Sequence, residues 1–190
     1  FRVTPKQSAA ENWPGRYANL GELPNAELVA LQRSASAWHA RRARVILQAR
    51  AAAGKVDRAT HELLREVFSQ DAPVDYRLRA MWALHITGGF TTADRAAALA
   101  DRDEYVRGWA IQMLCEDGAP PQPVIDRFAQ MAADDSSAVV RLYLAAALQR
   151  LPHGARWSIA QSLVAHAQDA EDHNLPKMIW FGIEPLVAGD

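Results

Sequence analysis

The fold is most readily inferred from the segment Asp101-Arg-Asp-Glu-Tyr-Val-Arg-Gly-Trp-Ala-Ile-Gln-Met-Leu-Cys115. It begins with acidic residues and continues with apolar residues at the spacing of one helix face. The same layout returns 34 residues later in Asp135-Ser-Ser-Ala-Val-Val-Arg-Leu-Tyr-Leu-Ala-Ala-Ala-Leu148. A motif that recurs at this interval indicates a helical repeat. We therefore predict an all-α fold, a right-handed α-solenoid of about five helix pairs.

Length and composition agree with this prediction. A chain of 190 residues can hold about five helix pairs of roughly 35 to 40 residues each. Its hydrophobic content of 49% is that of a globular protein, which excludes a disordered chain. The net charge of −1 and the pI near 6.7 argue against a protein that binds the phosphate backbone of nucleic acid. No uncharged apolar run reaches the length of a membrane span, about 18 residues.

The predicted domain boundary lies near residue 23. Residues 1–23 contain proline and glycine but no helical period, so we expect a linker or the end of a preceding domain, with Trp13 and Tyr17 packed on the first repeat. Residues 24–190 form the predicted repeat domain. Because the chain starts at Phe1 instead of a methionine and opens with no signal peptide, we expect a piece of a longer protein whose targeting signals lie elsewhere.

Hydrophobic periodicity and capping residues divide the repeat domain into alternating outer and inner helices. The expected outer helices are 24–32, 57–69, 92–99, 124–133 and 152–168, and the expected inner helices are 37–53, 76–87, 101–115, 135–150 and 175–187. Trp38 is assigned to the buried stripe of its helix. Cys115 also falls on an apolar face, and a buried small hydrophobe is favoured over a reactive thiol.

Acidic residues and arginines recur at matching places in the inner helices. The set is Asp75, Arg79, Asp103, Arg107, Asp135 and Arg141. The residues one turn before the three arginines are Asp75, Asp103 and Ser137. In the first interpretation the aspartates at these places cap helix starts and each arginine binds an acid or carbonyl of the adjacent repeat, which fixes the stacking of the repeats. In the second, the arginines line a concave surface and bind carboxylates or phosphates. We favour the stacking ladder, because recurrence in every repeat follows the architecture more closely than one ligand.

Residues that do not recur are better candidates for a partner surface. Tyr76, His85, Tyr105 and Trp109 are of this kind, although core packing also explains aromatic pairs one turn apart. The basic run Arg41-Arg-Ala-Arg44 could bind an anionic partner, but a solvated face paired with neighbouring acids is favoured.

No arrangement of residues predicts catalysis or a cofactor. The six histidines show no ligand spacing, and no Ser-His-Asp set or glycine-rich phosphate loop can be placed. The best candidate metal ligands are Asp169, Glu171, Asp172 and His173, and helix capping by Asp172 or Asn174 explains that cluster more simply. We expect no catalytic, cofactor-binding or metal residue in this chain.

The segment Asp103-Glu-Tyr-Val-Arg-Gly-Trp-Ala-Ile-Gln-Met-Leu114 resembles a HEAT repeat. A broader resemblance covers most of the chain and is carried by five segments: Trp38-x-x-Arg-Arg-Ala-Arg44, Arg79-Ala-Met-Trp-Ala-Leu-His85, Asp103-x-x-Val-Arg-x-Trp-Ala110, Val140-Arg-Leu-x-Leu-Ala-x-Ala-Leu-Gln-Arg-Leu151, and Glu171-Asp-x-Asn-Leu-Pro-x-Met-Ile-Trp-Phe-Gly-Ile-Glu-Pro-Leu186. They are similar to the helical middle region of the bacterial membrane-bound dehydrogenase family.

This resemblance implies a β-propeller before the HEAT-like region and a c-type cytochrome after it, so Phe1 to Thr4 would end the last propeller strand. Haem c would then lie elsewhere in the parent, and no catalytic residue is carried onto this chain. The implied role is a scaffold that contacts protein domains, in the periplasm or another extracytoplasmic compartment. The alternatives are a cytoplasmic location and a nucleic-acid-binding or repair enzyme on a HEAT-like solenoid, similar to the alkylpurine glycosylases.

Overall fold

The computed structural model describes residues 19–70 and 72–187, and within these ranges the chain is all-helical. Trp13, Tyr17 and the segment from Phe1 to Thr4 lie outside the described residues. The α-helices are α1 (Asn25–Ala30), α2 (Ala37–Ala52), α3 (Arg58–Ser69), α4 (Val74–Ile86), α5 (Thr92–Ala98), α6 (Glu104–Leu114), α7 (Gln122–Asp134), α8 (Ala138–Ala147), α9 (His153–Val164) and α10 (Leu175–Val187). Short 3-10 helices cover Leu20–Glu22, Leu31–Arg33, Leu148–Arg150 and Ala167–Asp169. None of the helices in the described ranges is long and apolar enough to cross a membrane.

The helices begin where short polar side chains can accept backbone hydrogen bonds. Ser36 caps α2, Asp57 caps α3 and Thr91 caps α5 in a capping box with Asp94. After α4, Gly88 has a φ of 77°, a left-handed conformation that glycine adopts without steric cost. These signals are local, which is why the predicted helix ranges agree with the observed ones to within a few residues.

The chain divides into two compact units, residues 1–89 and 90–190. In the first unit α1 packs on α2 and α3 packs on α4, while α2 also contacts α4 and α1 contacts α3. Its core includes Leu28, Leu47, Leu64, Met81 and Leu84. The 3-10 helix Leu20–Glu22 packs on α2 as well.

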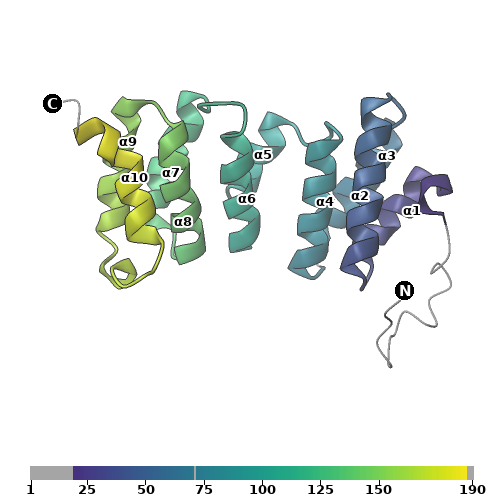
Figure 1. Cartoon of the computed structure of the whole chain (residues 1–190), viewed down its shortest axis with the longest axis horizontal. Helices are drawn as coiled ribbons and strands as arrows, with labels where there is room; N and C mark the ends of the chain where they lie inside the picture. Colours follow the sequence, from purple (N-terminus) through teal and green to yellow (C-terminus); the bar gives the residue numbers. More distant parts are fainter. Residues whose placement is uncertain (1–18, 71, 188–190) are drawn as a thin grey trace, which may run out of the picture. The chain divides into compact units, whose positions relative to one another are not determined.

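The second unit contains three helix pairs, α5 with α6, α7 with α8, and α9 with α10. The helices α6, α8 and α10 contact one another in that order and form one layer, and α7 packs against α9 in the other layer (Figure 1). The buried core of this unit includes Val106, Phe128, Leu144, Leu148 and Ile159. Burial of these apolar faces supplies most of the free energy that favours folding.

Two glycines let the helices of this layer approach closely. A Cβ atom at Gly108 would lie 2.7 Å from the ring of Tyr143, and one at Gly182 would lie 2.5 Å from the Cβ of Leu148. Both distances are shorter than van der Waals contact. The missing side chains therefore set the spacing of α6, α8 and α10.

The exposure of Cys115 and of Trp38 tests the prediction that both side chains are buried. Cys115 is buried and is a free thiol, as expected of a small hydrophobe. Trp38 was expected in the core and is 64% exposed, so that prediction is wrong. The buried residues of α2 are Ala40, Ala43 and Leu47, and two residues along an α-helix correspond to about 200°. Trp38 therefore points away from the side that Ala40 buries.

Candidate functional site

The most specific polar arrangement in the second unit is a pair of matching arginine–aspartate contacts. Arg107 on α6 donates from Nε to Oδ2 and from Nη2 to Oδ1 of Asp135, both at 2.8 Å. Its Nη1 donates to the carbonyl oxygen of Asp101 at 2.9 Å. The Nε and Nη2 groups thus bind the carboxylate and Nη1 binds a backbone carbonyl. The bidentate geometry makes the contact with Asp135 a strong one.

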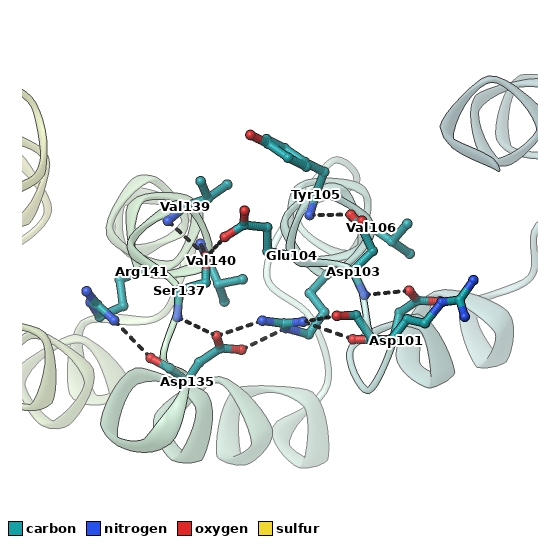
Figure 2. Close-up of polar contacts among 12 residues, drawn as sticks. Asp101, Asp103, Glu104, Tyr105, Val106, Asp135, Ser137, Val139, Val140 and Arg141 are labelled. Atoms are coloured by element: carbon teal, nitrogen blue, oxygen red, sulfur yellow. Dashed lines mark hydrogen bonds and ion pairs between the residues drawn. The ribbon is translucent and has the colours of Figure 1, made fainter. Parts of the chain in front are cut away.

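Arg141 on α8 repeats this geometry. Its Nε and Nη2 donate to the two carboxylate oxygens of Asp169, with an Nη2–Oδ1 distance of 2.7 Å. Its Nη1 donates to the carbonyl oxygen of Asp135 at 2.9 Å (Figure 2). The carboxylate of Asp135 therefore accepts hydrogen bonds from Arg107, and its backbone carbonyl accepts one from Arg141. Through Asp135, which lies in the turn between α7 and α8, the helices α6 and α8 are connected.

These residues follow a strict spacing. Asp101, Asp135 and Asp169 are 34 residues apart, and so are Arg107 and Arg141. The residue 34 after Arg141 is Leu175, so the series of arginines ends there. We call the Arg107–Asp135 and Arg141–Asp169 contacts the two rungs of the second unit.

Both rungs are largely buried, and the second is the deeper. The Arg107 and Asp135 side chains are 15% and 8% exposed, and those of Arg141 and Asp169 are 3% and 9% exposed. The hydrogen bonds that each arginine donates to its aspartate raise the pKa of that arginine above its usual value, and burial opposes this only in part. Each rung therefore holds its guanidinium in the charged form.

The residues that start α6 and α8 are distinct from the rungs. Asp103 Oδ1 accepts from the backbone N–H groups of Tyr105 and Val106, and Ser137 Oγ accepts from those of Val139 and Val140 (Figure 2). Asp103 and Ser137 are thus N-caps.

Arg79 in the first unit is held differently from Arg107 and Arg141. Its Nη1 donates to the carbonyl oxygen of Ser34 at 2.7 Å, and its Nη2 lies 3.1 Å from Asp75 Oδ2. Pro73 stands six residues before Arg79, where the other two arginines have an aspartate. The prediction that Asp75 caps its helix is wrong, because α4 already begins at Val74 and has no side-chain cap.

The four residues suggested for a partner surface do not form one set. Tyr76 and His85 lie on α4 nine residues apart, which places them on opposite sides of an α-helix. Tyr105 is 46% exposed and points away from the contacts around Asp135 (Figure 2). Trp109 is half-buried with its ring centroid 6.3 Å from that of Tyr143. Larger exposed aromatic surfaces, which the sequence did not single out as such, belong to Trp38, Trp157, Trp180 and Phe181.

The acidic turn before α10 consists of structural contacts. Asp169 belongs to the second rung, and Asp172 Oδ1 accepts from the backbone N–H groups of Asn174 at 2.8 Å and Leu175 at 2.7 Å. These bonds lower the pKa of Asp172. In residues 19–70 and 72–187 no group of three His, Cys, Asp or Glu side chains is arranged to hold a metal ion.

Cys115 should be chemically inert in the folded chain. Burial raises the pKa of its thiol to about 11, so the reactive thiolate at pH 8 is about 100-fold rarer than for an exposed cysteine. We expect iodoacetamide at pH 8 to modify the folded chain at least 100-fold more slowly than the chain in guanidinium chloride, measured by intact mass. As the pH rises toward 11 the native rate should increase. A native rate within tenfold of the denatured rate at pH 8 would contradict this assignment.

In comparisons with known proteins, no protein-family model and no curated protein matches this chain.

Proposed function

We propose that this chain is a non-catalytic, HEAT-like scaffold, built as a right-handed α-solenoid of about five helix pairs, that binds other protein domains. One observation carries the proposal. The Arg107–Asp135 and Arg141–Asp169 rungs have the same geometry at a 34-residue interval and connect successive helix pairs. Repeat proteins owe their stability to such contacts between neighbouring repeats.

The resemblance of the sequence to the bacterial membrane-bound dehydrogenase family supplies the biological setting of the proposal. In that setting the chain is the helical region of a larger extracytoplasmic redox protein, it holds the other domains in position, and haem c belongs to a neighbouring module. The rungs described above engage Arg107 and Arg141, the basic residues of α6 and α8, which supports a structural role for both.

The coding sequence on both sides of the chain tests this setting. We expect propeller blades encoded before Phe1 and a Cys-x-x-Cys-His haem attachment motif encoded after Asp190. A start codon close to Phe1, or unrelated domains on both sides, would contradict the redox setting. The scaffold proposal itself would then still be tested by the stability experiments described in the Discussion.

A nucleic-acid-binding enzyme is the second candidate, and one observation favours it. The helices α2 and α4 of the first unit carry six arginines and a single acidic residue, Asp75. The expected result of an electrophoretic shift assay with duplex DNA is no binding at physiological salt, because three of these six arginines, Arg50, Arg77 and Arg79, already donate hydrogen bonds within the chain. Binding that weakens steeply with salt would favour this candidate over the scaffold.

A further inference from the structure

The two units of the chain have opposite charge. Residues 1–89 contain 13 Lys and Arg against 8 Asp and Glu, whereas residues 90–190 contain 8 against 14. The first unit therefore has a formal charge of +5 and the second of −6. The near-neutral total conceals a strongly basic unit, and such asymmetry indicates a charged partner.

Most arginines of the first unit already have internal partners. Arg50 binds Asn25 and the carbonyl of Gly21, and Arg77 donates to the carbonyl of Phe68. Hydrogen bonds or ion pairs within the chain are also made by Arg33, Arg58, Arg65 and Arg79. Among the residues that the structure describes, only three arginines of this unit have neither a hydrogen bond nor an ion pair: Arg41, Arg42 and Arg44.

Two of these three border a cleft between α2 and α4. The cleft has a volume of about 240 Å³, and its lining includes Arg41, Arg44, Arg79, Asp75 and Trp82. The Arg44 guanidinium carbon lies 5.0 Å from the centroid of the Trp82 ring. This cation–π contact holds the guanidinium at the cleft. Its N–H groups, which have no hydrogen bond to the described residues, are the groups that bind a carboxylate in a bidentate fashion.

Arg44 lacks a counterion in this setting. Its pKa is lowered, first by burial and then by the positive charges of Arg41 and Arg79, yet a guanidinium stays protonated in proteins. Asp75 is bound to Arg79. The cleft therefore has an excess of positive charge that a negatively charged ligand would neutralise.

The surface beside the cleft indicates what carries the negative charge. Trp38 and Val45, which are 64% and 47% exposed, lie three residues before and four residues after Arg41 on α2, and so share one helix face with it. Exposed tryptophan and arginine side chains on one face are typical of protein interfaces. A nucleic acid would instead need a track of free cations along its backbone, whereas the free arginines here fall within one helical turn.

We propose that the cleft between α2 and α4 binds the carboxylate of an acidic side chain in a partner protein, with Arg44 and Arg41 as its cationic ligands and Trp38 and Val45 as apolar contacts. This site rests on the scaffold proposal and gives the chemical class of the partner. The scaffold proposal is argued from the rungs of the second unit, whereas all residues of the cleft belong to the first unit, so the two can fail separately. A small free carboxylate would bind the arginines by the same hydrogen bonds, and the experiment below distinguishes it from an acidic peptide.

The test is a titration of the full chain, observed through the arginine Nε–H resonances by NMR at constant ionic strength. The probes are hexaglutamate, glutarate, inorganic phosphate and a short DNA duplex. We expect hexaglutamate to shift the Arg44 resonance saturably and more tightly than phosphate. The variant Arg44→Gln should weaken binding at least tenfold, and Arg42→Gln, which removes the same charge from the same helix outside the cleft, should weaken it less than twofold.

Further variants distinguish a protein carboxylate from a small free carboxylate and control for misfolding. Trp38→Ala should weaken hexaglutamate but not glutarate if the ligand is a protein segment, and an equal effect on both would overturn the protein assignment. Circular dichroism controls for folding, and Arg44→Lys, which keeps the charge but loses the bidentate edge, replaces Arg44→Gln if that variant unfolds. Equal losses in Arg42→Gln and Arg44→Gln, or tighter binding of phosphate or duplex DNA than of hexaglutamate, would overturn the proposal.

Discussion

Replacing Asp169 by asparagine should lower the free energy of unfolding by about 3 kcal/mol, since it leaves a buried arginine without its counterion. The Arg141 side chain is 3% exposed and holds Asp169 with two hydrogen bonds. Asparagine keeps the shape of the side chain but removes its charge and one acceptor. Arg141 then bears the cost of an uncompensated charge, which is larger than the net contribution of the original pair.

Urea unfolding followed by circular dichroism measures this effect. The matched control is Glu171→Gln, an exposed acid two residues away, which should change the stability by less than about 0.5 kcal/mol. Replacing both partners, as in Arg141→Met with Asp169→Leu, should cost less than Asp169→Asn alone, because no buried charge remains. A loss below about 1 kcal/mol for Asp169→Asn would show that the rung is not buried in solution.

Gly182→Ala should destabilise the second unit by about 1 to 3 kcal/mol through overpacking. The new Cβ would lie 2.5 Å from the Cβ of Leu148, and Leu148 is fully buried, so it cannot move its side chain into solvent. The backbones of α10 and of the 3-10 helix Leu148–Arg150 would have to separate, which also disturbs the packing of α8 and α10.

Gly154→Ala in α9 is the matched control for this substitution. Nothing lies within 4 Å of a Cβ at that position, so only the helix propensity changes, by up to about 1 kcal/mol in favour of alanine. Comparing the two variants removes the propensity effect and isolates the clash. If Gly182→Ala is as stable as Gly154→Ala in urea unfolding, the close approach of these helices is not present in solution.

Much of the helical architecture could be predicted from the sequence because its signals are local. Capping residues and apolar periodicity placed helices such as α3 and α10 within one or two residues of their observed bounds. The error at Trp38 has the same local origin. A large apolar side chain was assigned to the core, although Ala40, Ala43 and Leu47 form the stripe that α2 buries.

The particular aspartate that each arginine binds could not be predicted from local spacing. Asp103 precedes Arg107 by four residues, the ideal distance for a pair on one helix, yet it caps α6 while Arg107 reaches Asp135, 28 residues further along the chain. Asp169 was considered as a metal ligand in an acidic turn. The 34-residue interval from Asp101 through Asp135 to Asp169 was the signal that could have identified both rungs.

A double-mutant cycle on Arg107 tests whether the rungs connect successive helix pairs. Combining Arg107→Met with Asp135→Asn should give a coupling energy of about 2 kcal/mol or more in urea unfolding, as expected for a buried, bidentate charge pair. Combining Arg107→Met with Asp103→Asn, the pair suggested by local spacing, should give a coupling within about 0.5 kcal/mol of zero. The opposite result, with strong coupling to Asp103 and none to Asp135, would contradict the ladder and the scaffold built on it.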